Sequence, residues 1–349
     1  MTPEFTRTSD FQYDLPTELI AQEPLPDRGG SRLLVVRRGT PAAEPVLEDS
    51  RFDTLPALIP PGDLLVINTT RVRHARLLGT RASGGPAEIL LIHPAVGDTW
   101  VAIGKPGSAL RPGKRITLGP EASVEIVEVL PNGNRLVRFL GTSAEEAMRR
   151  YGRLPLPPYI DRAPDQRDES RYQTIYAQAE GSVAAPTAGL HFTRELIERL
   201  ARAGVHIEGL DLQVGTGTFK PVEVEDPTQH EMHPEHYMIS PELAQSIDRV
   251  KQAGRSVWAV GTTVVRALES AVREDGTIQS GEAETTLMIL PGYRFRVVDR
   301  LITNFHLPRS TLLMLVCAFA DRELVLAAYQ HAVAARYRFY SYGDAMVII

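Results

Sequence analysis

Hydrophobic and polar positions in the first 154 residues alternate in short runs that predict strands. RLLVV (Arg32 to Val36) and DLLVI (Asp63 to Ile67) are bounded by turn-forming stretches such as DRGGS and PPGD. From about Arg71 to Leu154 such runs follow one another closely, with GGP, KPGS and PNGN among the turns: AEILLI, TWVAI, KRITL, VEIVEVL and NRLVRFL. Short strands at this spacing, with few helical signals, predict a small closed barrel over residues 71–154.

Beyond the proline-rich passage LPLPPYI the pattern changes to alternating helices and strands. Apolar residues recur at helical spacing in TRELIERLARAG, SPELAQSIDRVKQAG, TTVVRALESAVRE and DRELVLAAYQHAVAARY, and strand-like runs lie between them: VHIEGLDLQV, SVWAV and YRFRVVDRLI. Ser240 and Ser310 are predicted helix N-caps. We predict an α/β fold: a discontinuous α/β domain formed by both chain ends, residues 1–70 and 155–349, with the small β-barrel of residues 71–154 inserted.

Composition and charge narrow the class of protein. The 349 residues are 43% hydrophobic and hold one cysteine, Cys317, which excludes an intramolecular disulfide and fits a reducing compartment. Because the N-terminal stretch has no secretory pattern and no apolar run reaches about 20 residues, we expect a cytoplasmic protein without a membrane segment. The net charge of −5 argues against a protein that coats nucleic acid, but a selective RNA enzyme needs only local positive surface. Candidate RNA-binding residues are Arg71, Arg76, Arg153 and Arg162, with ordinary solvated arginines as the alternative.

Two segments place a histidine in a turn ahead of a helix. In SVAAPTAGLHFT, Thr193 is the predicted N-cap of the next helix, whose partial positive charge favours a neutral His191 able to act as a base. A histidine that only closes the turn is the alternative. DRLITNFHLPRSTL holds Asp299, Asn304 and His306, residue types that are frequently functional on loops. Here the alternative is that Asn304 serves the turn and His306 is a satisfied polar group.

Two further segments combine glycine with threonine. LQVGTGTFKPV offers backbone amides and hydroxyls to a ligand, unless it is only a tight turn. SVWAVGTTVVRALES reads as strand, turn and helix, so amides at the helix N-terminus can hold a carboxylate such as that of methionine; an ordinary turn capped by a threonine is the alternative. The candidate ligand-binding residues are Gly215, Thr216, Gly217, Thr218, Gly261, Thr262 and Thr263.

Two other stretches hold residues that suggest a metal site or a stacking surface. Three histidines, His230, His233 and His236, suggest a metal site, but Pro234 interrupts the helix that would align them and their spacing matches no zinc motif, so we expect no metal. The aromatic tail YRFYSYGDAM either closes the core, which we favour, or offers a stacking surface.

Together these motifs resemble the S-adenosylmethionine:tRNA ribosyltransferase-isomerase family. The resemblance covers nearly the whole chain, is weakest across the predicted barrel, and is carried by segments such as QYDLPTELIAQEPLPDRGGSRLLVV, PPGDLLVINTTRVRHARLLG, SVAAPTAGLHFT, VGTGTFKPV, HEMHPEHY, AVGTTVVRALESA and PGYRFRVVDRLITNFHLPRSTLLMLVCAFA. Two places depart from the family pattern: Gln213 stands where histidine is usual, and NTTRVRHAR differs at Thr69 and at Arg73-His74.

The resemblance implies an α/β domain with an inserted barrel and a reaction on tRNA carrying 7-aminomethyl-7-deazaguanine at the wobble position. S-adenosylmethionine is the cosubstrate and donates its ribosyl group, adenine and methionine leave, and the product is epoxyqueuosine. It implies no metal or redox cofactor, and we expect a monomer.

The chemistry suggests roles for the candidate residues. The sulfonium acidifies the neighbouring 5′-carbon, so our hypothesis is that His306 or His191 removes a proton there, with Asp299 orienting a partner. Asn304 joins the candidate S-adenosylmethionine-binding residues. Aromatic candidates to hold adenine or shield the cation, each of which can equally be core, are Phe192, Phe219, Tyr237 and Phe305. The rival functions are a methyltransferase, a non-catalytic RNA-binding module and a metal hydrolase.

Overall fold

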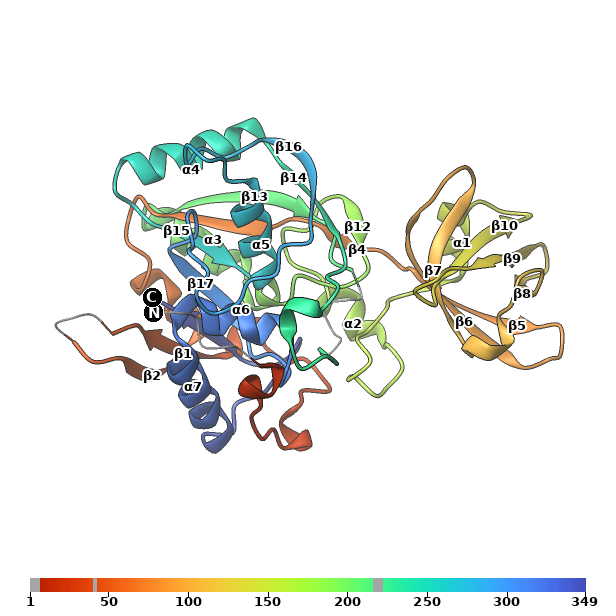
Figure 1. Ribbon diagram of the computed structural model, residues 1–349, viewed down its shortest axis with the longest axis horizontal. Coiled ribbons are helices and arrows are strands. Elements are labelled where there is room, and N and C mark those ends of the chain that lie inside the picture. The colour runs from red at the N-terminus through yellow and green to blue at the C-terminus, as the bar shows by residue number, and fades with distance from the viewer. Residues whose placement is uncertain (1–6, 40–42, 216–221) are drawn as a thin grey trace.

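Two sheets organise the computed structural model, which describes residues 7–39, 43–215 and 222–349 (Figure 1). The larger sheet has nine strands in the order β16-β14-β13-β3-β15-β17-β18-β1-β2, and its central strands β13, β3, β15 and β17 are parallel. These strands are β1 (Arg32–Arg37), β2 (Val46–Arg51), β3 (Leu64–Asn68), β13 (His206–Leu212), β14 (Glu235–Ile239), β15 (Val257–Val260), β16 (Gly281–Thr285), β17 (Arg300–Asn304) and β18 (Ala345–Ile348).

Helices cover both faces of this sheet because successive side chains of its central strands alternate between two cores. Leu64, Val66 and Leu301 belong to one core, whereas Leu65 and Ile302 belong to the other. The helices of this part are α2 (Gln166–Arg171), α3 (Arg194–Arg202), α4 (Pro241–Gln252), α5 (Thr262–Ala271), α6 (Thr311–Ala320) and α7 (Arg322–Ala334). The predicted N-caps Thr193, Ser240 and Ser310 each accept a bond from a first-turn amide, which confirms these helix starts.

The smaller sheet closes on itself and stands apart from the main body (Figure 1). Six strands run in the order β5-β6-β7-β10-β9-β8, and pairing of β5 with β8 completes the barrel. Its elements are β5 (Arg76–Arg81), β6 (Pro86–Pro94), β7 (Thr99–Lys105), β8 (Arg115–Gly119), β9 (Ala122–Val129), β10 (Arg135–Leu140), α1 (Ala144–Tyr151) and β11 (Gly152–Arg153), which pairs with β5. A two-stranded sheet of β4 (Arg71–Val72) and β12 (Glu180–Ser182) lies at the crossing.

The predicted fold class is therefore confirmed, while the limits at residues 70/71 and 154/155 stay predictions. One predicted strand is wrong in part: YRFRVVDRLI becomes β17 only from Arg300 onward. The reason is Glu269 on α5, a buried carboxylate that accepts bonds from the amides of Arg296, Val297 and Val298. These amides are then not free to pair with a neighbouring strand.

The carboxyl ends of the parallel strands bring distant segments to one edge of the sheet. β15 leads into Gly261, β17 leads into Phe305 and His306, and β13 leads toward Gly215. Ligands in open α/β sheets bind outside this edge. Among the described helices, none has the length and apolar character of a membrane span.

Candidate active site

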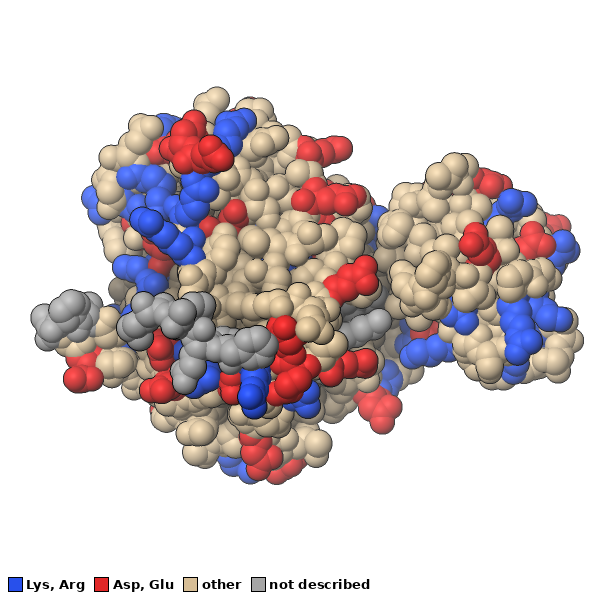
Figure 2. All heavy atoms as spheres, in the orientation of Figure 1, with Lys and Arg blue, Asp and Glu red and all other residues tan. Residues whose placement is uncertain are grey.

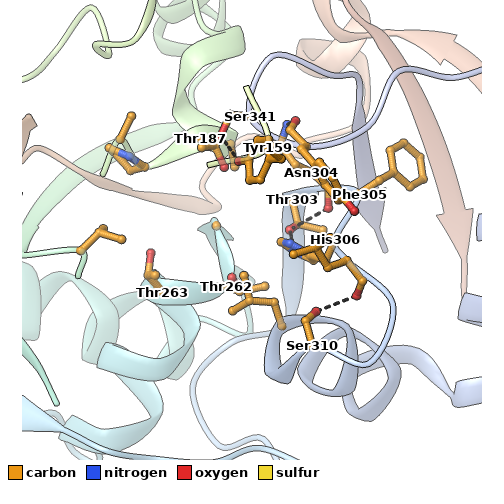
Figure 3. Close-up of a pocket in the computed structure, with 18 residues that line it drawn as sticks. Tyr159, Thr187, Thr262, Thr263, Thr303, Asn304, Phe305, His306, Ser310 and Ser341 are labelled. Atoms are coloured by element: carbon orange, nitrogen blue, oxygen red, sulfur yellow. Dashed lines mark hydrogen bonds between the residues drawn. The ribbon is translucent and has the colours of Figure 1, made fainter. Parts of the chain in front are cut away.

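A pocket of about 640 Å³, counting the part open to solvent, lies at this carboxyl edge (Figure 3). Its walls come from Tyr159, from residues 185–188, from the turn at 261–263, from the stretch 303–312 and from Tyr340 with Ser341.

His306 is the one predicted catalytic histidine that lines this pocket. Its Nε2 lies 2.7 Å from Thr303 Oγ1, while no described residue hydrogen-bonds to Nδ1 (Figure 3). The backbone is held on both sides, because its N–H donates to Tyr329 Oη and its carbonyl accepts from Tyr13 Oη. Burial lowers the pKa of His306 to about 3, so the ring is neutral at neutral pH and can accept a proton.

His191 lies behind the pocket, at the end of the 3₁₀ turn η6 (Thr187–His191). Its Nδ1 is 2.8 Å from Ser31 Oγ and its Nε2 is 3.1 Å from Asn304 Nδ2, so both ring nitrogens are engaged. The pKa of His191 is lowered to about 4, and burial rather than the α3 dipole is the main cause. The ring is neutral as expected, but it does not reach the pocket.

Asp299 is not brought together with either histidine. It precedes β17, whereas Asn304 ends that strand, which separates the two by roughly 16 Å of extended chain. The Asp299 carboxylate accepts from Lys251 Nζ at 2.9 Å and from the amide of Val257 at 2.8 Å. Its contacts stabilise the amino edge of the sheet, opposite the site.

The predicted strand-turn-helix at Gly261 does face the pocket. Gly261 is the N-cap of α5 with φ +98°, a conformation that favours glycine, and no side chain caps the helix. The alternative of a cap by Thr262 or Thr263 is therefore wrong. Both threonines line the pocket, and the uncapped first turn directs backbone N–H groups toward it.

The glycine-threonine loop is only partly described. Thr216, Gly217, Thr218 and the aromatic candidate Phe219 lie outside the described residues. Gly215 is described and follows Val214, which lines the pocket.

The other aromatic candidates are largely core residues. Phe192 is fully buried and packs edge-to-face on Phe52. Tyr237, on β14, is buried in the larger of the two cores that flank the sheet. Phe305 lines the pocket but is fully buried, with its ring against Tyr329 and its neighbours.

A second, larger cleft of about 1660 Å³ lies between the barrel and the α/β domain. Three of the four predicted RNA-binding arginines, Arg76, Arg153 and Arg162, line it together with Lys105, which sequence reasoning missed. Figure 2 shows Lys and Arg side chains beside this junction. The cleft adjoins the pocket through neighbouring residues, since Pro158 and Ala184 line one and Tyr159 and Ala185 line the other.

The four arginines differ in how far their charges are already paired. Arg162 binds the buried Asp168 through two bonds of 2.6 and 2.8 Å, and Arg76 binds Glu88 at 2.8 Å. Arg71 lines neither cavity and donates to the carbonyls of residues 177 and 178. The side chain of exposed Arg153 has no hydrogen bond or ion pair with any described residue. It is the arginine best placed to meet a phosphate.

The two departures from the family pattern lie outside the pocket. Gln213 packs against Gly181, where an added Cβ would lie 3.0 Å from its Cγ, and Thr69 Oγ1 donates to the carbonyl of Leu210. The Arg73 guanidinium lies over the Trp100 ring, and His74 Nε2 is 2.7 Å from Glu169. The extra positive charge is therefore used for contacts within the chain.

Several pocket residues were missed because their segments have simpler structural explanations. Tyr159 belongs to the proline-rich crossing, and its hydroxyl lies 2.5 Å from Ser341 Oγ. The aromatic tail does close the core through Tyr337 and Phe339, yet its Tyr340 and Ser341 line the pocket. Among the described residues no group of three metal-ligating side chains is found, and His236 pairs with Glu284 across two strands.

A known protein family matches this chain across both the barrel and the α/β part. The model of a family described as queuosine biosynthesis protein matches residues 8–348. This chain belongs to the queuosine biosynthesis protein family. A relative from Symbiobacterium thermophilum named S-adenosylmethionine:tRNA ribosyltransferase-isomerase is 53% identical over 98% of this chain and 100% of its own length. One of the same name from Natranaerobius thermophilus is 47% identical over 98% and 99%.

A solved structure agrees with this membership. The crystal structure of S-adenosylmethionine tRNA ribosyltransferase from Thermotoga maritima covers 98% of this chain and 100% of its own, with 34% identity and a TM-score of 0.56. The inserted barrel and the large sheet thus belong to the architecture of the queuosine biosynthesis family.

Proposed function

We propose that this chain is a tRNA-modifying enzyme that transfers and isomerises the ribosyl group of S-adenosylmethionine onto 7-aminomethyl-7-deazaguanine at the wobble position of tRNA. The products are epoxyqueuosine-tRNA, adenine and methionine. The observation that carries the proposal is the near full-length match to relatives named for this activity. The pocket at the carboxyl edge supports it, because a mostly apolar cavity there, with the polar side chains of Thr303, Asn304 and His306 on its wall, can hold the donor.

His306 is the base in this proposal. The sulfonium acidifies the 5′-carbon, and the unengaged Nδ1 of His306 takes the proton. Because burial disfavours the imidazolium, the protonated ring is a strong acid and passes its proton on readily, for example to the departing adenine. Thr303 holds the opposite nitrogen and fixes the plane of the ring.

The cleft beside the pocket is the proposed path of the anticodon loop. An unstacked loop nucleotide can enter the pocket while neighbouring phosphates meet Arg153 and Lys105 at the cleft. Arg76 and Arg162 stabilise the cleft wall through their carboxylate partners. We therefore expect Arg153→Ala with Lys105→Ala to raise the KM for tRNA and to lower the salt slope of binding by about 1.5. Arg71→Ala is the matched control, and equal effects of both changes would contradict this path.

Product analysis tests the proposed reaction directly. S-adenosylmethionine labelled in the ribose is incubated with the protein and with tRNA carrying 7-aminomethyl-7-deazaguanine. Label in the RNA together with free adenine and methionine supports the proposal. S-adenosylhomocysteine instead would show a methyltransferase, and binding of RNA without any product would show a non-catalytic module.

The reaction as proposed uses S-adenosylmethionine as a cosubstrate and no metal or redox cofactor, and the enzyme acts as a cytoplasmic monomer. If no metal is used, turnover should remain complete after extensive chelation. Sedimentation of the protein with and without tRNA tests whether it is a monomer. Loss of turnover on chelation, restored by one metal ion, would favour a metal enzyme.

A further inference from the structure

The side chain of Asn304 is fixed in a single orientation. Its Nδ2 lies 3.0 Å from the carbonyl of Tyr340 and 3.3 Å from the carbonyl of Asp344. Carbonyl oxygens only accept hydrogen bonds, so the amide nitrogen must be the end that meets them. The third partner of Nδ2 is His191 Nε2 at 3.1 Å; because an amide nitrogen does not accept, Nε2 is the acceptor here and shares the two N–H groups with the two carbonyls.

This orientation determines the tautomer of His191. Since Nε2 accepts from Asn304, the ring proton of neutral His191 is on Nδ1, where it donates to Ser31 Oγ at 2.8 Å. His191 is 3% exposed and is neutral at neutral pH because burial lowers its pKa to about 4. A buried, neutral His191 thus adds a third acceptor for Nδ2 to the two carbonyls that hold the amide in this orientation.

The amide oxygen of Asn304 is left as an unused acceptor. Asn304 is 2% exposed, lines the pocket, and its Oδ1 has no hydrogen-bond partner among the described residues. Buried polar atoms in folded proteins nearly always have partners, so an orphan at a pocket wall indicates a donor on the ligand.

Next to this acceptor lies a group of donors. Val260 pairs with Ile302 in parallel register, and the Gly261 amide donates to the Ile302 carbonyl at 2.8 Å, so α5 starts at the same edge of the sheet where Asn304 ends β17. The α5 first turn has no side-chain cap and faces the same pocket. An α-amino acid head group carries an ammonium and a carboxylate on one carbon, and so matches an acceptor and a set of N–H donors that line one pocket.

We propose that the amino-acid end of S-adenosylmethionine binds here, with its α-ammonium on Asn304 Oδ1, its carboxylate on the α5 first turn, and His191 acting through Asn304 as a positioning residue. This inference rests on the proposed function. It gives His191 a part other than that of the base, and it makes Asn304 a determinant of donor specificity.

Two analogues of S-adenosylmethionine separate the two contacts: the deaminated analogue lacks the ammonium, and the decarboxylated analogue lacks the carboxylate. We expect calorimetry with the wild-type protein to show each analogue binding at least tenfold more weakly than S-adenosylmethionine. A deaminated analogue that binds as tightly as S-adenosylmethionine would overturn the proposal without any variant. If S-adenosylmethionine itself does not bind, it is the proposed function that fails.

Asn304→Ala assigns the ammonium contact. We expect this variant to bind S-adenosylmethionine at least tenfold more weakly than the wild type does, and the deaminated analogue less than twofold more weakly. Discrimination between the two ligands is then lost. Ser341→Ala is the matched pocket control, because Ser341 Oγ is turned to Tyr159, and it should preserve the ratio of affinities. Two results would overturn the assignment. One is that Asn304→Ala weakens the binding of both ligands equally. The other is that Asn304→Ala instead loses the discrimination against an analogue with inosine in place of adenosine.

His191 is tested by rescue. His191→Leu removes the acceptor behind Asn304 and should reduce the discrimination at least threefold, whereas His191→Gln can still accept from Nδ2 and should restore most of it. A purely structural histidine would give parallel losses of thermal stability and of affinity for both ligands in the two variants. That result would remove His191 from the positioning role.

Discussion

His191 and His306 are two turn histidines whose neighbourhoods in the sequence look alike, yet the fold gives them different surroundings. Both are neutral, because burial lowers the pKa of one to about 4 and that of the other to about 3. His191 has both nitrogens engaged and lies behind the pocket wall, while His306 lines the pocket with Nδ1 unengaged by any described residue. A depressed pKa therefore does not identify a base, whereas access to a ligand does.

The largest effect is expected from His306→Ala. If Nδ1 removes the 5′-proton, turnover should fall by about 10²–10⁴-fold, since general-base help typically contributes that much. Folding should persist, because the ring makes a single side-chain hydrogen bond, to Thr303. The rate of adenine release at saturating substrates measures the effect, and circular dichroism controls for folding. Wild-type turnover in this variant would remove His306 from the mechanism.

His191→Ala should instead act mainly on stability. The ring is buried against Phe52, with ring centroids 4.9 Å apart, and its loss leaves a cavity and takes one of three acceptors away from Asn304 Nδ2. We expect the free energy of unfolding to fall by about 3 kcal/mol, measured by urea denaturation. Turnover of the folded enzyme should change less than in His306→Ala. The reverse order of the two variants would make His191 the base and break the comparison.

A third prediction uses the low pKa of His191, which lies below its ordinary value near 6.5. Between these values the unfolded chain binds more protons than the folded one, so stability is complete above pH 6.5 and is lost as the pH falls toward 4. By pH 5 this histidine alone should cost about 2 kcal/mol. Urea midpoints between pH 7 and 5 measure the loss, and His191→Gln should remove about 2 kcal/mol of it, while the similar loss expected from His306, whose pKa is lowered to about 3, should remain. An equally steep loss in that variant would assign the pH dependence to other groups.

The sequence predicts the layers of this fold better than it predicts the site. Strand and helix periods are local, so β1, β3, α4 and the barrel strands follow from hydrophobic spacing, and so do the caps at Thr193 and Ser240. Proximity is not local. Asp299 and His306 share one motif, but the strand between them sends them to opposite edges of the sheet.

The same limit explains which site residues escaped prediction. Nothing in LPLPPYI or in the aromatic tail indicates that Tyr159 and Ser341, 182 residues apart, meet at the pocket wall. Pairing is equally hidden: Arg162 and Arg153 look alike in the sequence, but only the fold places Asp168 against the first. Side-chain chemistry is visible in a sequence, while the identity of a side chain's partners depends on tertiary contacts.

The smallest effect is expected from Tyr13→Phe, a change that alters the surroundings of His306 and not those of His191. Tyr13 Oη donates to the carbonyl of His306 at 2.6 Å, so this N-terminal residue holds the loop that presents the ring. Losing one such bond should cost about 1 kcal/mol and, if loop position governs the base, lower turnover about fivefold with little change in the KM for either substrate. Among the described residues Tyr13 makes no hydrogen bond or ring contact with His191, so the pH dependence of stability should stay as in the wild type. Unchanged turnover would mean that the bond that the His306 amide donates to Tyr329 Oη is enough to hold the loop.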